Sequence, residues 1–364
     1  MACKPFPDCI KVTMVLSFLL LLQTGFAQKD FRDLDALLEQ KQRLLGKDFV
    51  VMIWANNSSA GRNDTLVYKK EFGDFNSKTE AAIASCSKWL TAAMVMIFVD
   101  EGKLSLDDYV SNWLPEFARY GKNYITIRDC LCHMTGIRSE PITLLKMFER
   151  KKFSSLEEEV NSFAAKDIEA NPGTEFRYSE IGLNTAGRIL EIISKKKFDV
   201  LARQLLFVPL NMRKTSFSTL DGSAVNPSGG AVSTPDDYIH FLVMMLNKGV
   251  YQGKRILSEK SIGEMRKVET TRDQIKYAPK PAEGYNYASG AWVVEENSHA
   301  TSPDGGSVAT ALASPGLFGT WPLVDYCRGY AYLFFVKKLL SEERADVQKE
   351  IKATIDDKFP GDCK

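Results

Sequence analysis

Strand patterns occur at both ends of this chain, and the long segment between them has the spacing of helices. Near the N-terminus, Phe49–Ala55 and Thr65–Phe72 form two short apolar or alternating runs separated by a polar turn. Strand patterns return in 285–295, 309–324 and 329–336. This order predicts an α/β (α+β) fold, in which one antiparallel sheet is built from both ends of the chain, carries flanking helices and receives an inserted helical lobe.

Helices are expected wherever apolar residues recur every three or four positions. This spacing occurs in 31–45, in 85–101 and in the charged segment 341–358. The middle of the chain to about residue 265 is also mostly helical in its pattern. We therefore expect a sheet lobe from about 28–90 and 265–364, and a helical lobe from about 91–264.

The first 27 residues are typical of a secretory signal peptide. Lys4 and Lys11 precede the apolar run Val12–Leu22, and small residues occupy positions 25 and 27. The run is shorter than the roughly 20 apolar residues that cross a bilayer. We expect cleavage after Ala27, a secreted or periplasmic protein, and no stable membrane span in the mature segment 28–364.

Charge and cysteine content narrow the classes of partner. Lys+Arg 47 against Asp+Glu 46 gives a net charge of +1, which argues against nucleic acid as a partner. Cleavage would leave 7 − 2 = 5 cysteines, an odd number, and the spacing of Cys327 and Cys363 leaves a disulfide between them open. No CxxC occurs and the chain has only three histidines, at positions 133, 240 and 299, so we expect no zinc site.

The segment Ala84-Ser85-Cys86-Ser87-Lys88 contains the motif S-x-x-K at a predicted helix start. Residues three apart on a helix share a face, so Lys88 can reach the Ser85 hydroxyl. A serine becomes a nucleophile when a base takes its proton, and a desolvated lysine can be that base. The motif is short, and an N-cap serine beside a surface lysine would produce the same four letters. Cys86 is a weaker candidate nucleophile, because one residue along a helix turns a side chain by about 100°.

Several further segments accompany this motif in a familiar order. They are Val99–Asp108, Leu131–Ile137, Asn171–Gly173 with Phe176–Ser179, and Gly229–Thr234. Together with Ser85–Lys88, they resemble the serine β-lactamase and penicillin-binding-protein superfamily, especially its class C-like serine hydrolase and esterase branch. The resemblance covers nearly all of the mature chain and implies the β-lactamase/transpeptidase-like fold.

The resemblance also implies roles for individual residues. Ser85 would form an acyl-enzyme, and Lys88 and Tyr178 would share proton transfer. The backbone N–H groups of Ser85 and Leu317 would form an oxyanion hole, and Gly316 would let the substrate approach the chain. No organic cofactor or metal is required. His133 is expected to pack and cap a loop, and Trp89 to lie in the core.

Two positions depart from the family pattern. Glu180 stands where Tyr-x-Asn would place an asparagine, and could pair with Lys88 or face solvent. Ser314 opens the segment Ser314–Thr320, where the family has a lysine or histidine on its third-motif strand. We expect Glu180, Ser314 and Gly316 to contact the substrate. The missing cation favours an esterase over a β-lactamase, because that cation helps to bind a substrate carboxylate.

The sequence therefore predicts a secreted serine hydrolase that cleaves an ester or amide in a small molecule or peptide. One alternative is β-lactamase or D-alanyl peptidase activity on the same residues. Another is a catalytically inactive homologue that binds cell-wall peptides. The sequence does not indicate an oligomeric state.

Overall fold

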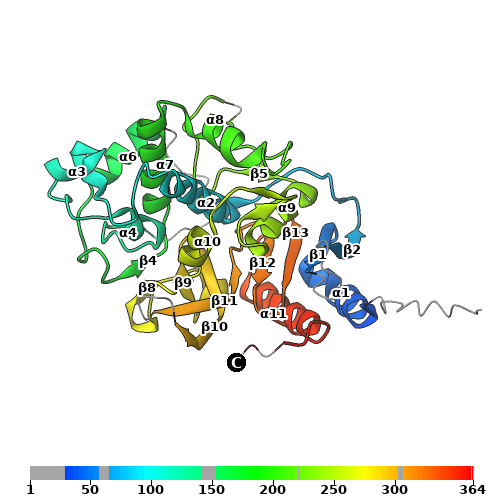
Figure 1. Ribbon diagram of the computed structural model, residues 1–364. Helices are drawn as coiled ribbons and strands as arrows, with labels where there is room; N and C mark the ends of the chain where they lie inside the picture. The colour runs from blue at the N-terminus through cyan, green and yellow to red at the C-terminus, as the bar shows by residue number, and fades with distance from the viewer. Residues whose placement is uncertain are drawn as a thin grey trace, which may run out of the picture.

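The computed structural model describes residues 29–56, 65–140, 153–219, 221–301, 306–361 and 363 (Figure 1). The expected signal peptide, 1–27, lies outside the described residues, as does most of the polar turn 56–64. Within the described ranges, no helix combines the length and apolar character needed to span a membrane.

A seven-stranded antiparallel sheet forms the centre of the molecule. Its order is β2-β1-β13-β12-β11-β10-β9. The strands are β1 (Phe49–Ala55), β2 (Thr65–Phe72), β9 (Asn286–Ala288), β10 (Ala291–Thr301), β11 (Ser307–Ala313), β12 (Trp321–Asp325) and β13 (Tyr330–Val336). β1 pairs with β13, and Met52 lies opposite Leu333. The prediction of one sheet built from both ends of the chain is confirmed.

Two of the predicted strands are each divided in the structure. Segment 285–295 contains the end of one strand and the start of another, because the chain turns at Gly290, whose φ is +79°. Segment 309–324 is interrupted by residues 314–320, which connect β11 to β12. Pro315 has no N–H for a sheet ladder, and Gly319 has a φ of +91°. The expected third-motif strand is therefore a loop.

The two faces of the sheet pack against different helices, because alternate strand residues point to opposite sides. On one face, Phe49, Val51 and Ile53 pack in a core with α1 (Arg32–Leu45) and α11 (Glu342–Asp356). On the other face, Val50 and Met52 pack against the larger core of the helical lobe. Figure 1 shows α1 and α11 together on one side of the sheet.

The helical lobe is built around α2 (Ser87–Asp100), which is buried along almost its whole length. A helix that is apolar on all sides is found inside a domain. Its longer neighbours are α6 (Leu156–Ala164), α7 (Ile181–Ser194), α9 (Pro235–Leu246) and α10 (Glu259–Met265). The shorter helical segments are η2 (Ala84–Cys86), η3 (Val110–Asn112), α3 (Pro115–Arg119), α4 (Ile127–Leu131), α8 (Phe198–Ala202), η4 (Arg203–Phe207), η5 (Arg272–Gln274) and η6 (Lys280–Ala282).

Three two-stranded ribbons complete the fold. They are β3 (Ala81–Ala82) with β5 (Val232–Ser233), β4 (Phe176–Arg177) with β8 (Ile275–Tyr277), and β6 (Val250–Tyr251) with β7 (Lys254–Arg255). Strand β3 leads into η2 and α2, and strand β4 leads into Tyr178.

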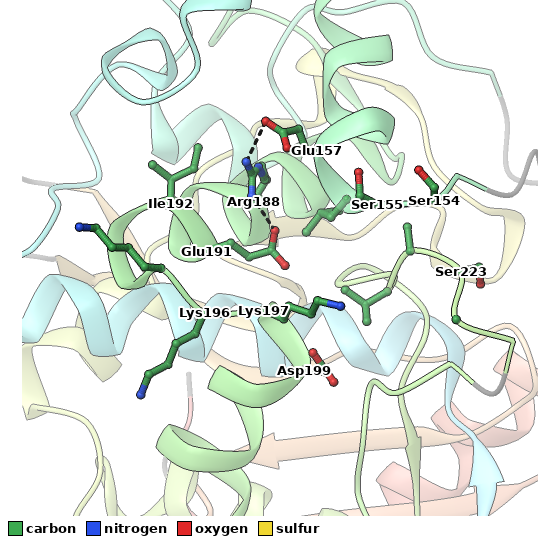
Figure 2. Close-up of a pocket in the computed structure, with 15 residues that line it drawn as sticks. Ser154, Ser155, Glu157, Arg188, Glu191, Ile192, Lys196, Lys197, Asp199 and Ser223 are labelled. Atoms are coloured by element: carbon green, nitrogen blue, oxygen red, sulfur yellow. Dashed lines mark hydrogen bonds and ion pairs between the residues drawn. The ribbon is translucent and has the colours of Figure 1, made fainter.

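A cavity of about 470 Å³ lies between α6, α7, the start of α8 and residues 222–225 (Figure 2). Its wall includes charged side chains, among which Arg188 pairs with Glu157 at 3.0 Å and with Glu191 at 3.1 Å. None of the site residues expected from the sequence lines this cavity.

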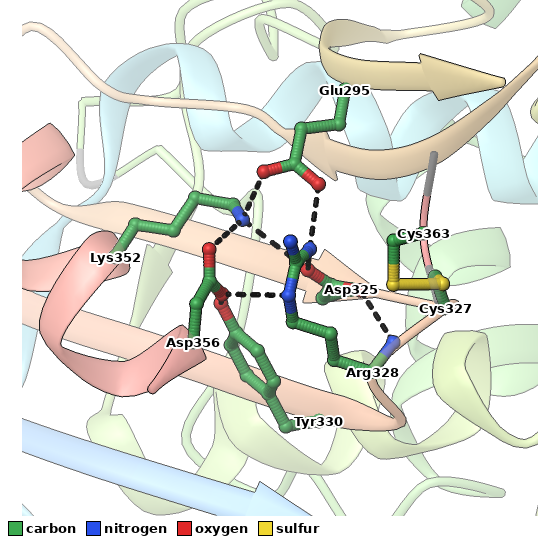
Figure 3. The surroundings of a disulfide bond; sticks show 8 residues. All are labelled: Glu295, Asp325, Cys327, Arg328, Tyr330, Lys352, Asp356 and Cys363. Atoms are coloured by element: carbon green, nitrogen blue, oxygen red, sulfur yellow. Dashed lines mark hydrogen bonds and ion pairs between the residues drawn. A yellow bond between two sulfur atoms is a disulfide. The ribbon is translucent and has the colours of Figure 1, made fainter. Parts of the chain in front are cut away.

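The C-terminal end of the chain is held to the sheet by a disulfide and by an ion-pair cluster (Figure 3). The structure contains the Cys327–Cys363 disulfide that the sequence had left open. Beside it, Lys352 Nζ contacts carboxylate oxygens of Glu295 at 2.6 Å and of Asp356 at 2.8 Å. Arg328 also reaches Glu295, at 2.6 Å. Arg328 and Lys352 are the two cations that hold these carboxylates close together. The cluster thereby attaches α11 to the sheet.

Candidate active site

Ser85 lies in the short helix η2, directly before α2, where the chain bends sharply. Ala84 has a φ of +45°, which is uncommon for a residue other than glycine. The preceding strand β3 pairs with β5, and the Ile83 N–H donates to the Ala231 carbonyl at 3.0 Å. These contacts hold Ser85, which is partly exposed, at the junction of the sheet and the helical lobe.

Lys88 is buried beneath Ser85, with 1% of its surface exposed. Its Nζ lies 3.5 Å from Ser85 Oγ, at the outer limit of a hydrogen bond, and donates to the Ser228 carbonyl at 2.8 Å. The expected position on one helix face is confirmed. A lysine held this close to a serine hydroxyl could take its proton when the amine is neutral.

Tyr178 completes the group around the Ser85 hydroxyl. It follows strand β4, and its N–H donates to the Tyr277 carbonyl at 3.1 Å. Its ring lies 4.7 Å from Lys88 Nζ and packs against Trp292 with ring centroids 5.3 Å apart. Burial raises the pKa of Tyr178, while a hydrogen bond with Ser85 acts in the opposite direction. The phenol therefore stays protonated at neutral pH and can relay a proton.

The loop 314–320 lies against the other side of the nucleophile segment. A Cβ added to Gly316 would lie 2.3 Å from the Ile83 carbonyl oxygen and 3.1 Å from Cys86 Sγ. Only glycine permits this approach. Leu317, the next residue, is partly exposed, which is compatible with a backbone N–H directed at a substrate.

Ser314 is buried, with 3% of its surface exposed. Its hydroxyl lies 3.2 Å from the Gly290 carbonyl oxygen and 3.4 Å from the Ser85 carbonyl oxygen. It thus contacts the backbone that carries the proposed nucleophile.

Glu180 is partly exposed at the N-terminal end of α7. Its carboxylate accepts a hydrogen bond from Asn226 Nδ2 at 2.7 Å. Asn226 was not expected from the sequence, although it lies directly before the motif Gly229–Thr234. The contact with Asn226 is one that neither sequence interpretation of Glu180 named.

Cys86 and His133 occupy structural positions. Cys86 Sγ points toward the Thr320 carbonyl at 3.6 Å, and burial raises the pKa of its thiol. The His133 Nδ1 accepts from the Ser179 N–H at 3.4 Å, and its Nε2 lies 3.2 Å from the Tyr287 hydroxyl. Burial holds the pKa of His133 well below its usual range, so a neutral ring packs beneath Tyr178. Trp89 is fully buried, as expected.

The structure brings Ser85, Lys88 and Tyr178 together, with Gly316 and Leu317 on the facing loop. Sequence reasoning missed Ser228, whose carbonyl holds Lys88, together with the asparagines that hold Ser228. Ser228 and Asn226 lie close before the motif Gly229–Thr234, which was their only signal in the sequence, and Asn184 had none. Nothing local marks a backbone carbonyl as the partner of a lysine 140 residues away.

Comparison with known proteins identifies relatives of the chain as a whole. The sequence model of the Beta-lactamase family matches residues 59–355. The chain is 25% identical over 309 residues to "Uncharacterized protein MT1414" of Mycobacterium tuberculosis, a match that covers 70% of this chain and 76% of the relative.

Solved structures share the fold over most of the chain. A proposed beta-lactamase from Bacteroides dorei aligns with a TM-score of 0.74 and 25% identity, covering 90% of this chain and 99% of the other. EstCE1, described as a hydrolase with promiscuous acyltransferase activity, aligns with a TM-score of 0.70 and 19% identity, covering 89% and 97% of the two chains.

Proposed function

The chain belongs to the beta-lactamase family of serine hydrolases and acyltransferases, and from this membership we propose that it cleaves an ester or amide through an acyl-enzyme on Ser85. The observation that carries the proposal is the position of Lys88 Nζ, 3.5 Å from Ser85 Oγ and buried beside Tyr178. An N-cap serine with a surface lysine, the alternative interpretation of the motif, would leave that lysine in solvent.

In the acylation step, Ser85 Oγ bonds to the carbonyl carbon of the substrate as its proton moves to the neutral amine of Lys88. One N–H of that amine donates to the Ser228 carbonyl, which holds the amine beside the Ser85 hydroxyl. The N–H groups of Ser85 and Leu317 stabilise the negative oxygen of the tetrahedral intermediate. Such donors each contribute roughly 10²–10³ in kcat in enzymes of this type.

Collapse of the intermediate breaks the bond to the leaving group, which takes the proton from Lys88 through the Tyr178 hydroxyl. The raised pKa of Tyr178 suits this relay, because a phenol can donate its proton and regain one from Lys88. Water then attacks the carbonyl carbon of the acyl group and passes one proton through Tyr178 and Lys88 to Ser85 Oγ. The bond between the acyl group and Ser85 breaks, which releases the acid and the free Ser85 hydroxyl.

The substrate preference follows from Ser314. A charge-assisted hydrogen bond to a substrate carboxylate is worth roughly 1.5–3 kcal/mol, and a serine at this position does not supply it. Two nearby candidates for the missing cation are already paired. Arg177 contacts Glu175 at 3.1 Å, and Arg328 belongs to the ion-pair cluster of α11. We therefore favour neutral short-chain esters over β-lactams and C-terminal D-residues by about ten- to a hundredfold in kcat/KM.

The test of the nucleophile is labelling with a fluorophosphonate, followed by intact-mass spectrometry. Wild type should gain one adduct, and Ser85→Ala should gain none. Loss of a hydrolytic nucleophile commonly costs on the order of 10⁶ in kcat, so a Ser85→Ala protein with most of its activity would disprove the assignment. A folded wild type that is never labelled would favour the inactive, peptide-binding alternative.

The test of the substrate is parallel hydrolysis of a p-nitrophenyl ester and a chromogenic cephalosporin by one preparation. Faster turnover of the cephalosporin would favour the β-lactamase or D-alanyl peptidase alternative. Under that alternative, Ser314→Lys should leave the ratio of the ester rate to the cephalosporin rate unchanged. Our proposal expects this substitution to reduce the preference for the ester.

We further propose that residues 1–27 direct secretion and are removed. The Cys327–Cys363 disulfide supports this, because disulfides persist mainly in oxidising compartments. N-terminal sequencing of the protein recovered from the periplasm or medium should begin at Gln28. Retention of Met1 in a soluble intracellular product would contradict the proposal.

A further inference from the structure

A line of buried polar groups leads from Lys88 into the helical lobe. Lys88 Nζ donates to the Ser228 carbonyl at 2.8 Å, and the Ser228 N–H donates to Asn184 Oδ1 at 2.9 Å. Asn184 Nδ2 then donates to Glu159 Oε2 at 3.1 Å. Ser228 and Asn184 are fully buried, and Glu159 is 2% exposed. Leaving any of these groups without its partner would be costly, so the line is well defined.

Asn184 can take only one orientation within this line. The backbone N–H of Ser228 can only donate, so Asn184 must meet it with its amide oxygen. The NH₂ of the same amide is thereby directed at Glu159 Oε2. A side chain at this position has to donate at one end and accept at the other, which an amide does and an apolar residue does not.

The peptide group between Pro227 and Ser228 is held at both of its ends. Its carbonyl, on Pro227, accepts from Thr91 Oγ1 at 2.6 Å. Its N–H is shared between Asn184 Oδ1 at 2.9 Å and Asn226 Oδ1 at 3.2 Å. The Ser228 hydroxyl also donates to Asn226 Oδ1 at 2.8 Å. Because a peptide group is planar, fixing both ends fixes the direction from which the chain continues to the Ser228 carbonyl.

We propose that Asn184 is a positioning residue for acylation, which orients the Ser228 carbonyl and through it holds the Lys88 amine at the Ser85 hydroxyl. The inference rests on the proposed function, in which Lys88 takes the Ser85 proton. A displacement of about 1 Å between reacting groups can cost on the order of 10²-fold in rate. Asn184 touches neither the substrate nor the reacting atoms, so its effect should appear in the acylation rate of folded protein.

Two double variants separate positioning from stability. Asn184→Leu with Glu159→Leu replaces the polar pair by an apolar pair, which leaves no unpaired carboxylate. Asn184→Asp with Glu159→Gln reverses the pair, because the new amide donates to the new carboxylate and that carboxylate still accepts from the Ser228 N–H. Thr185→Val is the control, since Thr185 is equally buried on α7 and its hydroxyl bonds only within the helix, to the Ile181 carbonyl at 2.7 Å.

The measurement is the rate of fluorophosphonate labelling of Ser85 per folded molecule, together with the melting temperature of each variant. We expect the apolar pair to label about 10- to 100-fold more slowly than wild type even where its melting temperature is preserved. The reversed pair and Thr185→Val should stay within about threefold. Wild-type labelling by a folded apolar pair, or equally slow labelling by both pairs, would overturn the inference.

If the apolar pair does not fold, Thr91→Val takes its place, because it frees the other end of the same peptide group. It should also slow labelling at least about tenfold, and an unchanged rate would count against the inference. Failure of the proposed function has a different signature, namely labelling that survives Ser85→Ala, or no labelling of wild type at all.

Discussion

Replacing Gly316 by alanine would test how closely loop 314–320 lies against the proposed nucleophile. The added Cβ would lie 2.3 Å from the Ile83 carbonyl oxygen, whereas ordinary contact begins at 3.4 Å. The deficit is 3.4 − 2.3 = 1.1 Å. The Ile83 oxygen is a backbone atom and the backbone fixes the position of a Cβ, so no side-chain rotation relieves the contact and the loop must move away from η2. The N–H of Leu317, the proposed oxyanion donor, moves with it.

A shift of this size in a transition-state contact costs on the order of 10²-fold in kcat/KM. This corresponds to about 2.7 kcal/mol of activation free energy. The assay is hydrolysis of a p-nitrophenyl ester, with the melting temperature as a check on folding. Gly263→Ala is the matched control, because a Cβ at Gly263 in α10 meets nothing within 4 Å. Activity within about threefold of wild type in a folded Gly316→Ala protein would refute this reasoning, since one misplaced donor alone should cost more.

Three further predictions follow from the site and from the sheet. Lys88→Ala and Tyr178→Phe should each slow acylation by roughly 10²–10⁴-fold in folded protein, measured by stopped-flow labelling, and unchanged rates would exclude them from proton transfer. Cys86→Ser should keep esterase activity within severalfold, because the thiol points at a backbone carbonyl and its pKa is raised by burial. Lys352→Met should lower the free energy of unfolding in urea by about 1–3 kcal/mol, since it removes one of two cations from the buried Asp325 and from the partly exposed Glu295 and Asp356. The exposed Lys349→Met on the same helix should change it by less than about 1 kcal/mol, and equal losses would argue against attachment of α11 by the cluster.

Much of the fold could be predicted because it depends on local patterns. The strands 49–55 and 65–72 were placed to the residue, since their apolar pattern ends at a polar turn. The helix 31–45 and the C-terminal helix likewise follow from apolar spacing. The errors were at Gly290 and in loop 314–320, where apolar content continues while the backbone turns.

In the candidate site too, local contacts could be predicted from the sequence and distant ones could not. Ser85 and Lys88 lie one helical turn apart, so their contact could be inferred from four consecutive residues. The partner of Glu180 could not, because Asn226 reaches it from a loop 46 residues further along the chain. Likewise, the sequence shows that position 314 has no cation, but only the structure shows that its hydroxyl faces two backbone carbonyls.

The amino-acid sequence by itself determined the strand and helix segments, the serine–lysine spacing and the order of motifs, because each depends on residues within a turn or two of one another. The tertiary structure decided what holds those residues in place. Lys88 depends on a carbonyl 140 residues away, and the C-terminus on a disulfide and an ion-pair cluster that join separate strands and a helix. Such contacts arise when the sheet closes and brings distant backbone groups together. Because every residue except proline carries the same N–H and C=O, the side-chain pattern does not predict which of these groups will pair.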